Sequence, residues 1–154
     1  MVESTKEKSG LRVAIIGASG AIGKEIVDYL KKDSRFSEVI LLVRKQLDEW
    51  KPEDFIPKLT VILKENFDSF DDVKDHLVGV DAFLCTLGTR VKVGDELFIK
   101  VDYQYPLNFA TLAKHLEVKH YGLLSSTGAD STSMLLYMRT KGRVERACKE
   151  VNLP

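Results

Sequence analysis

The sequence predicts an α/β protein, in which a parallel β-sheet of about five strands is covered by helices on both faces. Short apolar runs rich in β-branched residues alternate along the chain with longer segments of helical spacing. This alternation is typical of strands joined by right-handed helical crossovers, which build an open, doubly wound sheet. A chain of 154 residues is long enough for one such domain with a sizeable core, and the sequence shows no internal repeat or second domain.

Five apolar runs are the expected strands. They are Leu11–Gly17, Glu38–Arg44, Leu59–Phe67, Asp81–Gly88 and Tyr121–Ser126. Their apolar character indicates strands that are buried on both faces of the sheet. Ligands of such folds bind at the carboxyl ends of parallel strands, so the residues that follow each run are the first candidates for function.

Four segments are the expected helices. They are Ile22–Lys32, Ser69–Leu77, Gly94–Leu116 and Met134–Asn152. In the second, Ser69 stands at the start and acidic residues occupy the first turn, where they complement the helix dipole. Pro106 is expected to kink the long third helix because it has no N–H to donate. Residues 1–10 are polar and charged and are expected to form a disordered tail, so the folded domain should span residues 11–154.

The composition argues against several classes of function. The 23 basic and 23 acidic residues cancel, which does not favour nucleic acid as a partner. The N-terminal residues do not resemble a secretory signal, and no stretch approaches the ~20 apolar residues that span a membrane. Cys85 and Cys148 are too few for a disulfide framework, so we expect free thiols in a reducing compartment. Neither these cysteines nor the three histidines have the spacing of a metal site.

Three glycines follow the first expected strand, in the segment GASGAIG. Gly17 would allow the tight turn out of the strand, Gly20 would let the backbone approach a pyrophosphate, and Gly23 would let the helix pack closely on the sheet. The start of the helix would offer free N–H groups and a positive dipole end to the phosphates, and Ser19 could add a hydroxyl. The segment therefore predicts a dinucleotide site.

The segment is compatible with two other interpretations. The spacing is GxxGxxG rather than the more common GxGxxG, and a glycine-rich turn without a ligand is one alternative. The other is a Walker A loop, for which Gly23 and Lys24 would supply the GK pair. That loop is rejected because Glu25 stands where Ser or Thr must bind magnesium and Ala18 replaces the first glycine.

Charges around the second strand favour NADP(H) over NAD(H). An NAD site usually has Asp or Glu at the carboxyl end of this strand, where it binds the ribose hydroxyls. Glu38 stands at the entry to the strand instead, and Arg44 and Lys45 stand at its end. Two cations, one of them a guanidinium with a fork of donors, suit a 2′-phosphate. The alternative is that Arg44 is simply solvated at a strand end.

Tyr137 and Lys141 stand four residues apart in the last expected helix, so their side chains share a face. An ammonium near a phenol favours the phenolate, and such a tyrosine can exchange a proton with a carbonyl or an alcohol near neutral pH. Ser125 and Ser126, at the end of the fifth strand, could hydrogen-bond the reacting oxygen. The alternatives are an ordinary helix surface for the pair and loop capping for one of the serines.

Six segments carry a resemblance to a known family. They are GASGAIG, VRK, CTLGT, KVDYQYPLNFATLAK, LLSSTGAD and LYMRTKGRVE, which together are distributed over nearly the whole chain. In these segments the sequence resembles an atypical short-chain dehydrogenase/reductase. It is especially similar to the Tat-interacting-protein family of NADP-binding oxidoreductases. The resemblance implies a Rossmann-like fold, with residues 11–154 as an NAD(P)-binding domain.

The resemblance also implies a role for each matching residue. The catalytic set would be Ser126, Tyr137 and Lys141, with Ser125 as the less favoured serine. The cofactor contacts would be Gly17, Ser19, Gly20, Ala21 and Ile22 at the pyrophosphate with Gly23 packed behind them, Arg44 at the 2′-phosphate, Asn66 and Phe67 near the adenine, Leu87, Gly88 and Thr89 along the cleft, and Lys141 at the nicotinamide ribose. Lys45, from the charges after the second strand, and Tyr137, beside Lys141, are the remaining expected cofactor contacts. The family usually has Asp at the position of Asn66, whose amide oxygen can still accept a hydrogen bond.

Two functions follow as expectations. The first is an NADP(H)-dependent oxidoreductase that transfers a hydride to or from a small carbonyl or alcohol substrate, with Tyr137 and Lys141 as the chemical pair. The second is a catalytically silent, NADPH-bound regulatory protein with partners of the importin or transcription-factor type. The resemblance implies a location in the cytoplasm or nucleus, and fungal members are mitochondrial.

Members of this family continue past the segment VNLP with a sixth strand and a substrate-binding region. The chain is therefore expected to lack these C-terminal parts. The fifth strand would then form an exposed edge of the sheet, and pairing of that edge with another chain, as in a homodimer, is a further expectation.

Overall fold

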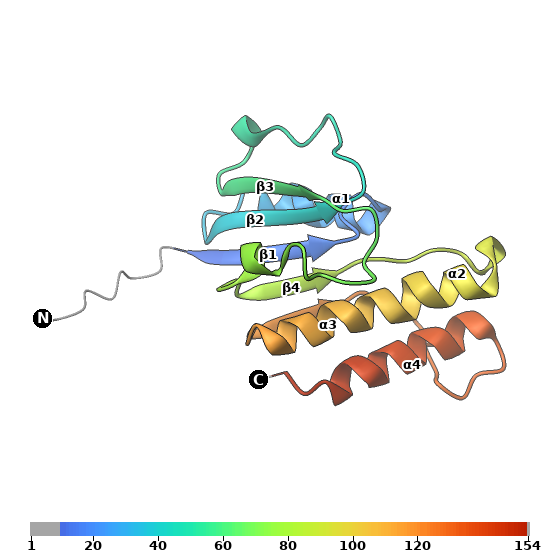
Figure 1. The fold of residues 1–154 in the computed structure, drawn as a ribbon. Helices are drawn as coiled ribbons and strands as arrows, with labels where there is room; N and C mark the ends of the chain where they lie inside the picture. Colours follow the sequence, from blue (N-terminus) through green and yellow to red (C-terminus); the bar gives the residue numbers. More distant parts are fainter. Residues whose placement is uncertain (1–9, 154) are drawn as a thin grey trace, which may run out of the picture.

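Five parallel strands form the centre of the protein (Figure 1). The computed structural model describes residues 10–153, and its strands are β1 Leu11–Ile16, β2 Phe36–Val43, β3 Lys58–Leu63, β4 Ala82–Cys85 and β5 His120–Leu123. They are ordered β3-β2-β1-β4-β5, and each neighbouring pair is parallel. The chain builds outward from β1 first in one direction and then in the other, so the predicted doubly wound parallel sheet is confirmed. Most of the expected N-terminal tail, residues 1–9, lies outside the described residues.

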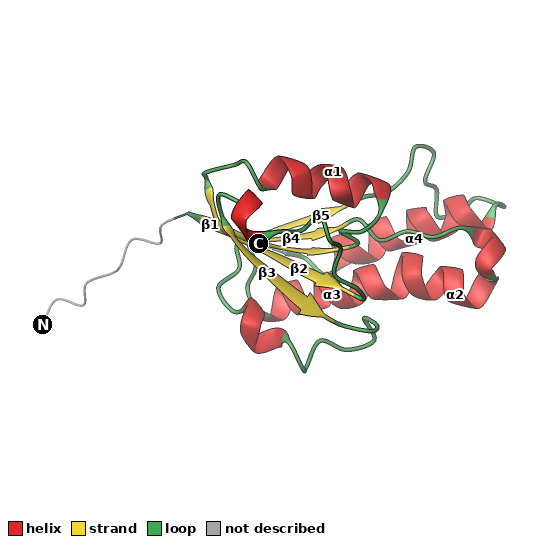
Figure 2. Ribbon diagram, turned by 90° about the horizontal axis from the view of Figure 1, so that it is seen from above, coloured by secondary structure: helices red, strands yellow, loops and turns green. Residues whose placement is uncertain are grey.

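Helices cover both faces of this sheet. They are α1 Ala21–Leu30, α2 Asp95–Ile99, a π-helical segment η4 Lys100–Gln104, α3 Tyr105–His115 and α4 Leu136–Glu150. Short 3₁₀ turns are η1 Pro52–Asp54, η2 Lys74–Leu77 and η3 Val91–Val93. Helix α1 lies on one face, and α3 and α4 lie side by side on the other (Figures 1 and 2).

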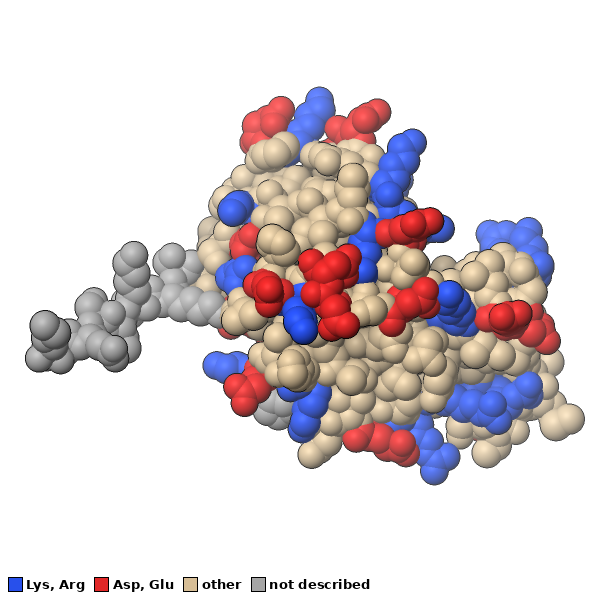
Figure 3. Space-filling model, viewed as in Figure 1, with Lys and Arg blue, Asp and Glu red and all other residues tan. Residues whose placement is uncertain are grey.

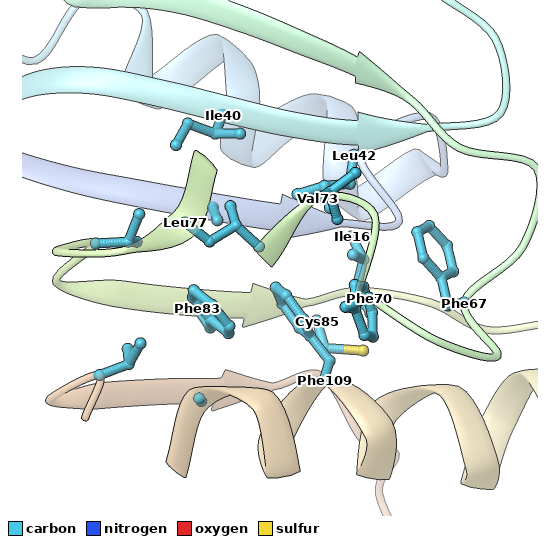
Figure 4. Close-up of a cluster of buried hydrophobic side chains, with 14 of the residues drawn as sticks. Ile16, Ile40, Leu42, Phe67, Phe70, Val73, Leu77, Phe83, Cys85 and Phe109 are labelled. Atoms are coloured by element: carbon cyan, nitrogen blue, oxygen red, sulfur yellow. The ribbon is translucent and has the colours of Figure 1, made fainter. Parts of the chain in front are cut away.

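The core on the α3 face is rich in aromatic rings (Figure 4). The rings of Phe83 in β4 and Phe109 in α3 stack with centroids 4.2 Å apart, and Phe70 packs against Phe109 at 5.4 Å. Ile16 and Leu42, from β1 and β2, are fully buried in the same cluster. These contacts hold α3 against the middle of the sheet, where its first turns reach the carboxyl ends of the strands.

The core on the other face is smaller and holds α1 against the sheet. Val27 and Leu30 of α1 pack with Val13 and Ile15 of β1, and Trp50 closes the cluster. All five side chains are buried. Because these contacts fix α1 on the sheet, its N-terminus is held beside the carboxyl end of β1.

The expected helix at Ser69–Leu77 is wrong, and the third strand is shorter than expected. Turns and the short η2 replace the helix. Phe70 and Leu77 do have helical spacing and are both buried, but nine residues are too few for a helix to be stable without packing along its whole length. The strand ends at Leu63, and Phe67 turns into the core instead of extending β3.

The long third helix contains the irregularity expected around Pro106. The chain passes from α2 through the π-helical η4 into α3, and Pro106 lies in the first turn of α3. The N–H of Tyr105 donates to the carbonyl of Lys100, five residues back. Pro106 has no N–H for the carbonyl of Asp102, four residues back, so a wider turn is accommodated immediately before it.

The outer surface carries charges of both signs. Lysine, arginine, aspartate and glutamate side chains are interspersed over the face seen in Figure 3, as the zero net charge leads one to expect. Among residues 10–153, no helix has the length and apolar character needed to cross a membrane, and no group of His, Cys, Asp and Glu could hold a metal. The sheet ends at β3 on one side and at β5 on the other, so β5 lies at an edge as expected.

Candidate functional site

The turn between β1 and α1 depends on two glycines that allow no side chain. Gly17 has a φ of +88°, and a Cβ there would lie 2.5 Å from the backbone N of Leu87. A Cβ on Gly23 would collide with the carbonyl oxygen of Gly17 and the backbone of Ala18. The Thr86 hydroxyl donates to the carbonyl of Gly17 at 2.9 Å, which ties the turn to the end of β4. These contacts bring β1, α1 and β4 together at one point.

The third glycine, Gly20, has a different environment. A Cβ on Gly20 would meet only the carbonyl oxygen of Gly17, at an ordinary 3.5 Å. Gly20 is the N-cap of α1; no side chain caps this helix, and no acidic residue lies in its first turn. The first N–H groups of α1 and the positive end of its dipole are therefore available to an anion that approaches over the exposed Gly20 and Ser19.

A cavity of about 380 Å³ opens at this point. Its walls come from the carboxyl ends of the strands and the loops that follow them, and from the α2–α3 segment. The lining residues are Gly17, Ser19, Gly20, Arg44, Glu65, Asn66, Phe67, Thr86, Leu87, Gly88, Thr89, Leu97, Val101 and Tyr105. This is the edge at which a doubly wound sheet binds its ligand, at the position where the strand order reverses.

Most of the residues expected to contact a cofactor line this cavity. They are Gly17, Ser19, Gly20, Arg44, Asn66, Phe67, Leu87, Gly88 and Thr89. Ala21 and Ile22 lie beside it in the first turn of α1, Gly23 is buried behind it, and Lys45 is an exposed side chain outside its walls. Five further residues line the cavity without having been expected from the sequence: Glu65, Thr86, Leu97, Val101 and Tyr105. Four of them lie in or next to segments that carry the family resemblance, but no motif assigns them a role.

Glu38 lies at the opposite end of the sheet, as its position in the sequence indicated. Its carboxylate accepts a hydrogen bond from Arg12 at 2.7 Å and one from the Thr60 hydroxyl at 2.6 Å. Burial alone would raise the pKa of Glu38, but these two partners lower it overall. Glu38 therefore stabilises the amino end of the sheet and has no access to a ligand at the carboxyl end.

Tyr137 and Lys141 share one face of α4, as expected. The Tyr137 ring is half-buried and stacks on Phe98 of α2 with centroids 5.8 Å apart, and the Lys141 Nζ lies 5.7 Å from the centre of the Tyr137 ring. Gly142 makes this arrangement possible, because a Cβ there would collide with the backbone of the loop at Ser131. Neither Tyr137 nor Lys141 is among the residues that line the cavity.

Lys141 forms a buried ion pair with a residue that the sequence analysis missed. Its Nζ lies 2.7 Å from Oδ1 of Asp102 in η4, and the two side chains are 6% and 0% exposed. The other carboxylate oxygen accepts the backbone N–H of Thr89 at 2.9 Å. Burial raises the pKa of Asp102 even though Lys141 and Thr89 favour the carboxylate. One feature of the sequence could have pointed to Asp102: it stands at helical spacing from Phe98 and Tyr105, so an acidic residue falls on the apolar face of the helix.

The two serines after β5 have buried hydroxyls. Neither Ser125 Oγ nor Ser126 Oγ has a hydrogen-bond partner among the described residues. Ser125 lines a separate hollow of about 640 Å³ between β5 and the C-terminal half of α4, away from the glycine turn, together with His120 and Cys148. Neither serine is among the residues that line the cavity at the glycine turn.

Comparisons with known proteins agree with this geometry. A family model described as NAD(P)H-binding matches residues 17–153. Over 141 residues the chain is 38% identical to the protein HTATIP2 of Rattus norvegicus, which covers 90% of this chain and 57% of that protein. Over 134 residues it is 32% identical to the mitochondrial protein FMP52 of Candida albicans, which covers 85% of this chain and 57% of that protein.

A solved structure gives the same fold. MoeE5 in complex with UDP-glucose and NAD superimposes with a TM-score of 0.73 at 16% identity, over 92% of this chain and 49% of that one. The chain thus spans little more than half the length of the curated relatives it matches. The family match runs from the first glycine of the turn to the end of the described chain, and the resemblance read from the sequence segments is confirmed. The chain belongs to the NAD(P)H-binding family of Rossmann-type proteins and is a relative of HTATIP2.

Proposed function

We propose that the chain is an NADP(H)-binding oxidoreductase of the short-chain dehydrogenase type, which acts on a small carbonyl or alcohol. One observation carries the proposal. One cavity of about 380 Å³ is lined both by Ser19 and Gly20, at the uncapped start of α1, and by the Arg44 side chain at the end of β2. A dinucleotide needs main-chain N–H donors for its pyrophosphate and, when it is NADP(H), a cation for its 2′-phosphate.

Arg44 is the residue that would select the phosphorylated cofactor. It follows β2 directly and is exposed at the rim of the cavity. Its guanidinium can donate two parallel hydrogen bonds to a phosphate. Within β2 the acidic residue is Glu38, which Arg12 holds at the other end of the strand, so β2 itself brings no carboxylate to the ribose of NAD(H). Glu65, which follows β3, also lines the cavity.

The chemical step would use the α4 pair and one serine. A bound cofactor supplies hydride transfer at its nicotinamide ring. Tyr137 would donate a proton to the carbonyl oxygen in reduction and accept it in oxidation, and Ser126 would hydrogen-bond the same oxygen. Lys141, whose Nζ lies 5.7 Å from the centre of the Tyr137 ring, would hold the nicotinamide ribose next to this tyrosine.

The decisive experiment is a fluorescence titration of the chain with NADPH and with NADH. We expect NADPH to bind more tightly, and Arg44→Ala to weaken NADPH binding about tenfold or more, since a charge-assisted hydrogen bond contributes about 1.5–3 kcal/mol. NADH binding should be the same in both proteins. Lys51→Ala is the control, because Lys51 is an exposed cation that does not line the cavity and has no expected contact with the cofactor. Equal affinities for both cofactors in the parent chain would contradict the choice of NADP(H).

A second candidate is a nucleotide-bound regulatory protein without turnover. The observation that favours it is the buried Lys141–Asp102 pair, which already satisfies the lysine expected at the nicotinamide ribose. An assay of NADPH oxidation with a set of different carbonyl compounds distinguishes the two candidates. Activity that disappears in Tyr137→Phe while NADPH affinity is kept supports the oxidoreductase; tight NADPH binding with no turnover on any carbonyl supports the regulatory protein.

A further inference from the structure

Asp102 is a fully buried carboxylate placed between two parts of the site. It is 1% exposed and lies in the π-helical turn η4. One oxygen faces Lys141 Nζ at 2.7 Å, and the other accepts the N–H of Thr89 at 2.9 Å. A buried charge is unfavourable unless it is paired and hydrogen-bonded, and π-helical turns often occur at functional sites. Replacing a whole buried ion pair by well-packed apolar residues is often neutral or stabilising, so the presence of this pair needs a reason other than packing.

The pair lies directly behind the wall of the cavity. A Cβ on Gly88 would stand 3.7 Å from Asp102 Oδ1 and 3.8 Å from Lys141 Nζ. Gly88 and Thr89 both line the cavity, whereas Asp102 and Lys141 do not. The backbone of the loop after β4 therefore lies between the ion pair and this cavity, and the Thr89 N–H connects that loop to the pair.

We propose that Asp102 is a positioning residue, which fixes the Lys141 ammonium beside Tyr137 and ties it to the loop that lines the cofactor cavity. The inference rests on the proposed function, in which Lys141 serves Tyr137 and the cofactor. Replacement of Asp102 by Asn preserves shape and an acceptor for Thr89, but its amide cannot neutralise Lys141. The ammonium would then be buried without a counter-charge and would leave its present position.

The first test measures the position of Lys141 without any cofactor. Lysine side chains of the folded chain are acetylated with an amine-reactive ester, and the rate at each lysine is followed by mass spectrometry. We expect Asp102→Asn to raise the rate at Lys141 on the order of tenfold, because the buried ion pair no longer holds it. Lys64 is the matched internal control, since it has a side chain only 9% exposed and pairs with Asp72 at 2.7 Å.

The Lys64 pair also supplies a matched control variant. Asp72→Asn should raise the rate at Lys64 and leave Lys141 unchanged. An unchanged rate at Lys141 in Asp102→Asn would overturn the proposal. A parallel rise at Lys141 and Lys64 in that variant would also overturn it, because it would show general loosening of the fold.

The second test is a double-mutant cycle on NADPH affinity with Asp102→Asn, Lys141→Met and the combined variant. Asp102→Asn should weaken binding about tenfold in the parent chain and by less than about twofold in the Lys141→Met background, since its effect passes through the lysine. Equal losses in both backgrounds would overturn the positioning role. If Asp102→Asn alone does not fold, Asp102→Glu takes its place in the cycle, because it keeps the negative charge but changes its distance from Lys141.

The two proposals fail in different ways. If the parent chain does not bind NADPH, the proposed function fails, while selective acetylation of Lys141 in Asp102→Asn would still support its positioning by Asp102. If NADPH binds but Asp102→Asn binds it as the parent does, the positioning role fails and the proposed function stands.

Discussion

Two alanine substitutions in the glycine turn should separate stability from cofactor binding. Gly23 and Gly20 lie three residues apart at the start of α1, but only Gly23 is packed against backbone. A Cβ on Gly23 would collide with the Gly17 carbonyl, which the hydroxyl of Thr86 holds in place. A Cβ on Gly20 would make one ordinary contact at 3.5 Å and would otherwise extend into the space assigned to the pyrophosphate.

The structure gives the size of each effect. For Gly23→Ala, the better helix propensity of alanine contributes about 1 kcal/mol, and displacement of α1 from β1 costs up to about 3 kcal/mol. The free energy of unfolding should fall by about 2 kcal/mol. Gly20 has φ −73° and ψ 168°, which alanine adopts without strain. The loss of a favourable N-cap and the lower entropy of the unfolded chain nearly cancel, so Gly20→Ala should change stability by less than about 0.5 kcal/mol.

Urea unfolding and NADPH titration of both variants check this reasoning. Gly20→Ala should unfold at the urea concentration of the parent chain and bind NADPH about tenfold or more weakly, a loss of about 1.4 kcal/mol. Gly23→Ala should unfold at lower urea. If Gly20→Ala binds NADPH like the parent chain, the pyrophosphate does not lie over Gly20 and the reasoning is refuted.

Three further predictions concern the rest of the molecule. Glu38 has a lowered pKa in the fold, so its contribution to stability is present above about pH 4.5 and is lost as the pH falls below that value; urea unfolding of Glu38→Gln should therefore change less between pH 6 and pH 3 than that of the parent. Burial raises the pKa of the Cys85 thiol to about 12, so a thiol reagent at pH 8 should label Cys85 quickly only after the chain is unfolded, whereas the half-buried Cys148, which lines a hollow, is accessible in the fold; fast native labelling of Cys85 would contradict its burial. Gly142→Ala should lower the free energy of unfolding by about 1–3 kcal/mol, measured in urea, because a Cβ there meets the backbone of the loop before α4; an unchanged value would mean that the loop yields without cost.

The sheet and most of the cofactor cavity could be predicted from the sequence, because both depend on local patterns. Buried parallel strands are apolar runs, and the glycine turn has a fixed spacing between β1 and α1. The positions of Arg44 and Glu38 at opposite ends of β2 follow from the direction of the strand alone. These are the parts in which a few neighbouring residues determine the structure.

The parts that could not be predicted depend on contacts between distant segments. The segment around Phe70 has helical spacing, but packing onto the sheet replaces the helix by turns and a 3₁₀ segment. Asp102 and Lys141 are 39 residues apart, and nothing in either segment reveals that α4 brings them within 2.7 Å. Leu97 and Tyr105 line the cavity because α2 and α3 pack over the ends of the strands, and this packing cannot be predicted from local sequence patterns.

The central claim is that the main chain at the start of α1 holds the diphosphate of a dinucleotide. Backbone ¹H–¹⁵N spectra of the labelled chain, recorded during addition of NADPH, test this claim most directly. We expect the largest changes at the amides of Ser19, Gly20 and Ala21, with smaller ones at Gly88 and Thr89. Saturating NADPH that leaves the Ser19–Ala21 amides unchanged, or shifts chiefly the residues between β5 and α4, would contradict the account.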